Sequence, residues 1–187
     1  MEEDELIKAC IRNDRVAYNH LFNKYAPKML MICTRYMSDE NEAKDVLQNG
    51  FIKVFKSIKK FKFEGSFEGW LKRIMINEAL SALRKKKKLI TRNSTIYENI
   101  DIAEDSVDKT IDYDFTQEEL LQTLKALPET FRVVFNLYCF EKYSHNEIAA
   151  ALSIKESTSR SRLRRARNIL KKELLILAEK SKSDERV

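Results

Sequence analysis

A chain of 187 residues that is 43% hydrophobic can bury one sizeable core or two small ones. The 34% charged residues and the formal net charge of +6 favour an anionic partner, and no run approaches the roughly 18 apolar residues of a membrane span, so we expect no membrane insertion. Three glycines and two prolines give few of the turns that an all-β fold needs. The expectation is therefore an all-α fold.

The chain begins with the acidic run Met1–Asp4, where a secretory signal would be basic, and we expect a cytoplasmic protein. Cys10, Cys33 and Cys139 are widely spaced, odd in number and set among apolar residues, which predicts buried, reduced thiols. No group of potential metal ligands in the sequence has the spacing of a binding site, so we expect no cofactor and no metal.

The N-terminal half predicts a series of amphipathic helices. Apolar residues recur at helical spacing over Leu6–Ile11 and again over Ala17–Tyr25. Met29–Tyr36 is apolar enough for a further, buried helix, and Ser38-Asp39 can cap the helix that follows.

That next helix is expected to run to about Lys60. Its inner face is predicted to carry Val46, Leu47, Phe51, Val54, Phe55 and Ile58. The same spacing predicts an outward set of polar residues: Glu42, Asp45, Gln48, Asn49 and Lys53. By spacing alone, Asp45 is an ordinary solvated acid.

The stretch FKFEGSF (61–67) cannot continue this helix, because its aromatic residues alternate and Gly65 suits a turn. It lies within a basic zone, 53–92, that carries thirteen bases against three acids. Aromatic rings interleaved with lysines are typical of surfaces that bind single-stranded nucleic acid. We expect Phe63 to be exposed, while Phe67 and Trp70 fit better in the core. The run 85–88 can equally be a solvated helix end.

From residue 93 to 119 the composition becomes acidic, with nine acids against Lys109. Apolar residues are sparse there, so a packed core is not expected. Residues 93–117 are therefore predicted to form a flexible acidic linker.

The C-terminal part predicts a second helical unit. A short helix around Leu120–Leu124 stops before Pro128, and another covers Glu129–Phe140. Ser144 and Glu147 have capping-box spacing at the start of a helix of about two turns. A tight turn over 152–155 leads into a long last helix, and this order is that of a helix-turn-helix.

On a helical wheel, Leu163, Ala166, Leu170 and Leu174 fall on one face of the last helix. The opposite face carries small polar residues between two rows of bases, and 155–172 holds eight bases against one acid. A recognition helix in the major groove needs this layout, since its arginines reach phosphates and base edges. A merely solvated face is the alternative, although such faces usually mix charges.

These segments together resemble an extracytoplasmic-function (ECF) sigma factor, a small two-domain initiation factor of bacterial RNA polymerase. The motifs similar to sigma region 2 are AYNHLF (17–22), EAKDVLQNGF (42–51) and FEGWLKRIMIN (67–77). Those similar to region 4 are LPETFR (127–132), EIA (147–149) and RSRLRRAR (160–167). The resemblance implies a region 2 bundle over 1–92, the linker, a region 4 helix-turn-helix over 118–178 and a tail over 179–187.

The resemblance also implies roles for individual residues in a non-enzymatic bacterial protein. Its implied partners are core RNA polymerase, through the β′ clamp helices and the β flap, promoter DNA and an anti-sigma factor. Contacts with core polymerase fall on Glu42, Asp45, Gln48 and Phe51. Those with the −10 element fall on Phe61, Lys62, Phe63, Glu64, Gly65, Ser66, Arg73, Asn77 and Arg84. Those with the −35 element fall on Ser157, Thr158, Arg160, Ser161, Arg162, Arg164 and Arg165.

Some positions depart from the family pattern. Lys142, Ser153 and Ser157 stand where glycine is frequent, which predicts some loss of turn stability. Asn49 stands where an acid is common. Two other functions stay open at this point: a polymerase-independent helix-turn-helix regulator, and a helical protein that binds acidic proteins.

Overall fold

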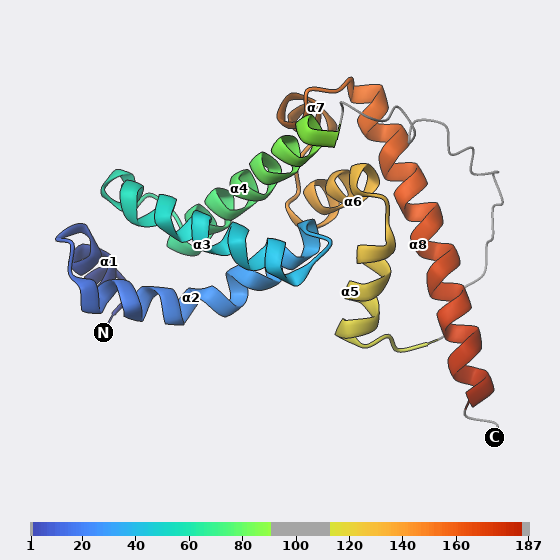
Figure 1. Cartoon of the computed structure of the whole chain (residues 1–187), viewed down its shortest axis with the longest axis horizontal. Coiled ribbons are helices and arrows are strands. Elements are labelled where there is room, and N and C mark those ends of the chain that lie inside the picture. Colours follow the sequence, from blue (N-terminus) through green and yellow to red (C-terminus); the bar gives the residue numbers. More distant parts are fainter. Residues whose placement is uncertain (1, 91–112, 185–187) are drawn as a thin grey trace. The chain divides into compact units, whose positions relative to one another are not determined.

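The computed structural model describes residues 2–90 and 113–184, with side chains for 2–86 and 113–180. The chain divides into two compact units, Met1–Asn93 and Ser94–Val187 (Figure 1). All regular structure in the described ranges is helical, which confirms the all-α prediction. The predicted acidic linker lies outside the described residues up to position 112.

Unit 1 is a bundle in which α2, α3 and α4 pack on one another and α1 packs on α2. Asp14 caps α2 by accepting hydrogen bonds from the backbone N–H groups of Val16 and Ala17, and Asp39 caps α3 in the same way. The elements are α1 (Glu3–Ile11), α2 (Arg15–Tyr36), α3 (Glu40–Ser57), the 3-10 turn η1 (Ile58–Lys60) and α4 (Phe67–Ile90).

The prediction of separate helices over 17–25 and 29–36 was wrong, because α2 runs through both. Pro27 lies inside it and faces solvent. Proline removes one backbone hydrogen bond from a helix. The buried stripe on the other side, with Leu21 and Met29 at 0% exposure, continues past this position and holds the helix together.

The helices α3 and α4 approach closely at Gly50. A Cβ atom there would lie 2.3 Å from Sδ of the buried Met75. Lys53 of α3 also pairs with the buried Glu78 of α4. Both features fix the two helices that carry most of the candidate residues of unit 1.

Unit 2 packs its shorter helices against one long helix. Its elements are α5 (Gln117–Ala126), α6 (Glu129–Phe135), the π-helical η2 (Asn136–Phe140), α7 (His145–Leu152) and α8 (Glu156–Asp184). One cluster of its core consists of Leu124, Leu127, Phe131 and Ala166. The helix predicted over 129–140 therefore changes from α to π geometry at Asn136, and α8 continues beyond residue 178, where the sequence placed the end of the domain.

The helix-turn-helix is built as its pattern predicts. Ser144 and Glu147 form a complete capping box at the start of α7. Ser153 ends α7 in the left-handed conformation, with φ of 54°, and Lys142 has φ of 61°. Both positions thus favour glycine, whereas Ser157 lies in the first turn of α8 and has no positive φ.

Two of the three cysteines are buried as predicted, and Cys139 is half-buried; all three are free. Burial, together with the nearby Asp14 carboxylate, raises the pKa of the Cys10 thiol to about 11. Burial raises that of Cys33 to about 12. None of the described helices combines the length and the hydrophobicity that a bilayer crossing needs.

Candidate functional site

The outward face of α3 carries the predicted polymerase contacts. Asp45 and Gln48 are exposed and lie about one turn apart. Glu42 is half-buried and pairs with Lys86 of α4. Phe51 is only 2% exposed, and its ring packs against Phe22 at 4.7 Å between centroids. Phe51 therefore takes the inward position that helical spacing predicted and supports the surface from the core.

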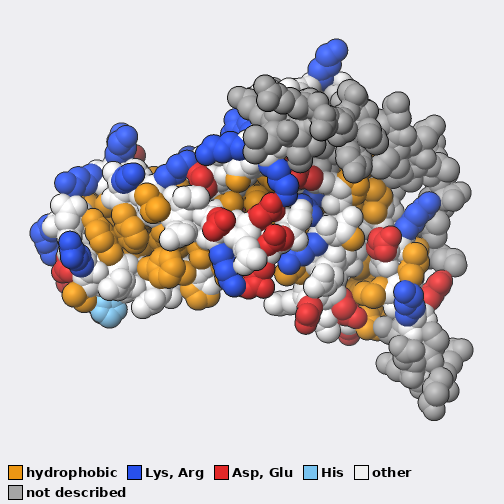
Figure 2. Space-filling model, viewed as in Figure 1, with side chains coloured by type: hydrophobic (Ala, Val, Ile, Leu, Met, Phe, Trp, Pro, Cys, Tyr) orange, Lys and Arg blue, Asp and Glu red, His pale blue; other side chains and the backbone are white. Residues whose placement is uncertain are grey.

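The C-terminal half of α3 and the start of α2 expose apolar side chains that the sequence did not single out. Ile52 is 45% exposed and follows Gln48 by one helical turn, and Phe22 and Val16 of α2 are 37% and 65% exposed. Figure 2 shows hydrophobic side chains gathered over this part of unit 1. The sequence held one signal of this exposure: Ile52 follows Gln48 by four residues, which places both on the same face of the helix. An acidic and polar face thus lies beside an apolar one.

The loop over 61–66 has no regular structure and follows η1 directly. Phe61 is 8% exposed, with its ring centroid 5.1 Å from those of Phe63 and Phe67. Phe67 is buried as predicted and Trp70 is half-buried. Phe61 therefore anchors the loop in the core, beneath the residues that the loop exposes.

Phe63 is the aromatic residue that this loop exposes, at 41%, as predicted. Its φ of 57° lies in the left-handed region, which is a strained conformation for a bulky residue. Gly65 has φ of 94°. Strain of this kind is typically retained at binding sites, where the surroundings hold it in place. The remaining predicted loop residues are exposed: Lys62, Glu64, Gly65 and Ser66.

The predicted residues of α4 share one side of that helix. Arg73, Asn77 and Arg84 are all exposed and fall within about 40° of one another at about 100° per residue. The Nε of Arg84 donates a hydrogen bond to the carbonyl oxygen of Leu80 (3.2 Å). Two cations and an amide therefore follow the loop along one helical edge.

The recognition helix presents its residues at the start of α8. Arg160 forms an ion pair with Glu156, and the hydroxyl of Ser161 donates to the carbonyl oxygen of Thr158 (3.0 Å). Ser157, Arg160, Ser161 and Arg164 are exposed, whereas Thr158, Arg162 and Arg165 are half-buried. The side chains stand on a regular helix whose opposite face, including Leu163 and Ala166, is buried.

A polar contact that sequence reasoning missed joins α7 to α8. The Nδ1 of His145 lies 2.9 Å from Oγ of Ser159, which is fully buried. The imidazole stacks on Tyr138 at 4.7 Å, and the guanidinium of Arg167 lies over the same ring at 5.7 Å. Burial and the charge of Arg160 lower the pKa of His145 below its usual 6.5. The separation of fourteen residues between His145 and Ser159 gave no local signal.

The comparisons with known proteins agree on one family. Residues 21–89 match the family model for Sigma-70 region 2, and residues 117–170 match that for Sigma-70, region 4. The RNA polymerase sigma-H factor of Pseudomonas aeruginosa is 30% identical over 181 residues, covering 92% of this chain and 94% of that protein. The chain belongs to the ECF class of RNA polymerase sigma factors. Its function is that of a non-enzymatic transcription initiation factor, with core RNA polymerase and promoter DNA as partners.

Two further relatives extend the match for this ECF sigma factor. The ECF RNA polymerase sigma-E factor of Haemophilus influenzae is 30% identical over 189 residues, which is 93% of this chain and 96% of that protein. The sigma factor RpoE of Bartonella quintana, solved in complex with the anti-sigma factor NepR, shares the fold with a TM-score of 0.52 at 20% identity. That similarity covers 85% of this chain and 97% of that one.

Proposed function

We propose that this sigma factor divides its work among three surfaces. The polymerase surface consists of Asp45 and Gln48 with Glu42 beside them. The −10 surface consists of the loop 61–66 and the exposed edge of α4. The −35 surface is the start of α8. Residues 1–92 and 118–178 act as the region 2 and region 4 domains, joined by the linker 93–117.

The polymerase surface binds the β′ clamp helices. An exposed carboxylate and amide on a rigid helix can form charge-assisted hydrogen bonds with basic residues of a partner. The packing of Gly50 against Met75 and the pair of Lys53 with Glu78 fix α3, so these groups are oriented before binding. Phe51 contributes from beneath by its packing on Phe22.

The −10 surface holds a base that has left the duplex. Stacking on an aromatic ring is worth about 1–3 kcal/mol per base, and extruded bases are commonly bound this way. The single observation that carries the proposal is Phe63, an exposed ring on a strained backbone in a basic loop. Arg73, Asn77 and Arg84 then follow the strand along α4.

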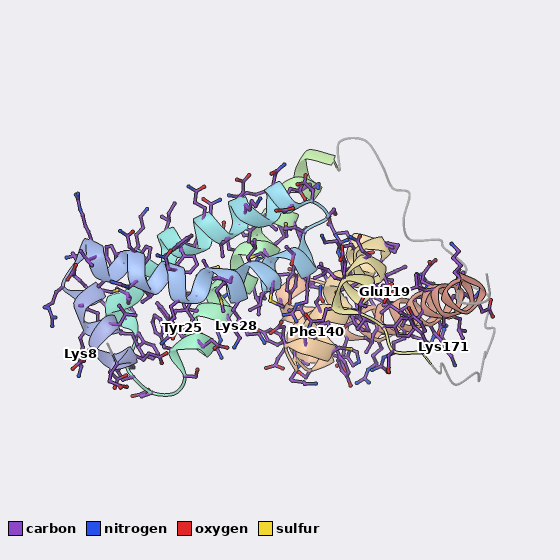
Figure 3. All side chains as sticks on the ribbon, turned by 90° about the horizontal axis from the view of Figure 1, so that it is seen from below. Lys8, Tyr25, Lys28, Glu119, Phe140 and Lys171 are labelled. Atoms are coloured by element: carbon purple, nitrogen blue, oxygen red, sulfur yellow. The ribbon has the colours of Figure 1, made fainter. Side chains whose placement is uncertain are left out.

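The −35 surface reads duplex DNA through the major groove. Arg160, Arg162 and Arg165 are candidates for guanine edges, since bidentate contacts with guanine are the commonest specific ones. The serine and threonine hydroxyls and Arg164 serve for phosphates and shape. Unit 2 also docks on the β flap, for which the exposed Phe140 of η2 offers an apolar contact (Figure 3).

The sigma factor acts in the bacterial cytoplasm and is held inactive by an anti-sigma factor. The relative from Bartonella quintana, which was solved with such a partner, supports this regulation. A polymerase-independent regulator is not favoured, because the family match includes region 2 as well as the helix-turn-helix.

The test is reconstitution with core polymerase and selection of bound promoters from genomic upstream DNA. Changing Asp45 and Gln48 together to Ala should weaken core binding at least tenfold, since about 1.5–3 kcal/mol attaches to hydrogen bonds of charged groups. The affinity of the free protein for duplex DNA should not change. Lys44→Ala, an exposed neighbour paired with Glu40, is the control. Full activity of the double variant would reject the polymerase surface.

A further inference from the structure

The helix α1 precedes the segment matched by the region 2 family model, which begins at residue 21. It nevertheless reaches the −10 loop. Figure 3 labels Lys8 on α1. The Nζ atom of Lys8 lies 6.0 Å from the centroid of the Phe63 ring. This distance is at the limit within which a cation is attracted to an aromatic face.

The position of Lys8 is set by a well-anchored helix. The other side of α1 is buried in unit 1 through Leu6, Ile7, Ala9 and Cys10. Near its start, Glu3 accepts a hydrogen bond from Tyr25 of α2 and pairs with Lys24 at 3.3 Å. Because α1 also packs on η1, which leads into the loop, Lys8 and Phe63 are held on neighbouring elements.

Lys8 differs in its ion pairing from many lysines in this unit. Within the described residues Lys8 pairs with no carboxylate. The contrast is with five lysines that each pair with one: Lys24, Lys28, Lys44, Lys53 and Lys86. Three further exposed lysines, Lys59, Lys60 and Lys62, lie on η1 and the loop. Exposed cations beside an exposed aromatic ring are suited to a nucleotide, which brings a ring and a phosphate together.

We propose that Lys8 is part of the −10 surface, where it contacts a backbone phosphate of the strand whose base stacks on Phe63. The inference rests on the proposed role of Phe63. One face of that ring meets the ammonium, and the exposed remainder is open to a base. The long stem of lysine and its three N–H donors allow the ammonium to face the ring and bind the phosphate of the same nucleotide.

The experiment measures the affinity of the reconstituted holoenzyme for a single-stranded oligonucleotide, the non-template −10 strand of a promoter selected as above. The variants are Lys8→Ala, Lys8→Arg, Phe63→Ala and the control Lys44→Ala. We expect Lys8→Ala to weaken binding about fivefold and to reduce the salt slope by about 0.7, the value for one phosphate contact on a single strand. Lys8→Arg should restore both, and Lys44→Ala should alter neither.

The outcomes distinguish a failure of the proposed Lys8 phosphate contact from a failure of the proposed −10 role of the loop. If Phe63→Ala weakens binding while Lys8→Ala leaves affinity and salt slope unchanged, the inference fails and the −10 loop stands. If neither variant matters, the role of the loop fails as well. A loss with Lys8→Ala at an unchanged salt slope, or one not restored by Arg, would make Lys8 a support for the loop and also reject the phosphate contact. Since Lys8 is exposed and alanine favours helices, folding should be unaffected.

Discussion

The two proposed nucleic-acid surfaces of this sigma factor are built from opposite kinds of backbone. In unit 1 the loop over 61–66 has no regular structure and presents Phe63 with φ of 57°. In unit 2 the −35 surface lies on the regular helix α8, and the strained positions, Lys142 and Ser153, precede that helix. Strain is therefore part of the presented surface in unit 1 and only part of the scaffold in unit 2.

This difference corresponds to the state of the DNA that each surface is proposed to meet. A regular major groove accepts a regular helix, whose side chains repeat at a fixed spacing. A base outside the duplex has no such regularity and needs a ring turned toward it and held there. Each of the following experiments separates these two designs.

The largest effect is expected for the −35 surface, on changing Arg160 and Arg165 together to Ala. Each arginine that reads a base contributes about 1–3 kcal/mol, so holoenzyme affinity for a duplex with the −35 element should fall about 100-fold. Binding to the single-stranded −10 oligonucleotide should stay the same. Fluorescence anisotropy on the two probes measures both.

The matched control changes Lys171 and Lys172 to Ala, which removes the same charge from the same helix. These lysines lie outside the −35 surface, so removing their positive charge should weaken binding to all duplexes alike and reduce the salt slope. An equal loss of sequence preference in both double variants would show that the arginines supply charge alone.

Much of the fold could be predicted from apolar spacing and capping residues. Asp39 and Ser144 cap helices where the sequence placed them, and Phe63 and Phe67 face outward and inward as expected. The continuity of α2 through Pro27 could not be predicted from local rules, because it depends on burial against other helices. The π-helical turn at Asn136 likewise has no signal in apolar periodicity.

The sequence predicted which segments carry the candidate surfaces better than it predicted which individual residues are exposed on them. Family resemblance placed Phe51 and Phe61 among the contact residues, but both rings are buried. Helical spacing had already turned Phe51 inward, so physical periodicity was the better guide for that residue. Lys8 and His145 were missed because their partners, Phe63 and Ser159, are distant in sequence and meet only in the folded chain.

The next effect concerns the support of the recognition helix. Removing the cap with Ser144→Ala should cost about 1 kcal/mol of stability, as for other N-caps, and should also weaken duplex binding because α7 packs on α8. Thr116→Ala removes the equivalent capping box of α5, so it should lower stability by a similar amount. Its effect on duplex binding should be smaller, because it is α7 that contacts the start of α8 directly, through His145 and Ser159. Thermal melting and anisotropy give the two values, and equal binding losses would contradict a specific role for α7.

A smaller effect distinguishes strain in the surface from strain in the scaffold. Glycine accepts a positive φ without steric cost, so Phe63→Gly and Ser153→Gly should each raise stability by about 0.5–1 kcal/mol. Only Phe63→Gly should reduce −10 binding and promoter opening, because Ser153 serves the turn alone. The Phe63→Ala variant keeps the strained backbone but lacks the ring. The difference in stability between Phe63→Ala and Phe63→Gly therefore measures the cost of the strained backbone alone. A destabilised Phe63→Gly variant would mean that packing of the ring outweighs the strain.

The smallest effect is the titration of His145, which reports phosphate contact within unit 2 alone. Burial and the positive charges of Arg160 and Arg167 lower its pKa, while Glu156 opposes them. The folded state therefore favours the neutral imidazole of His145. The resulting contribution to stability is complete above about pH 6.5, the pKa of an unfolded histidine, and is lost as the pH falls from there toward the lower pKa of the folded state.

Duplex DNA should raise the pKa of His145, because phosphates offset the charge of the arginines. Arg160→Ala should raise it in the free protein. Ring-proton NMR in a His20→Gln background, where His145 is the sole histidine, measures each shift. If duplex DNA left the pKa of His145 unchanged while binding tightly, the start of α8 would not be the surface that meets the phosphates.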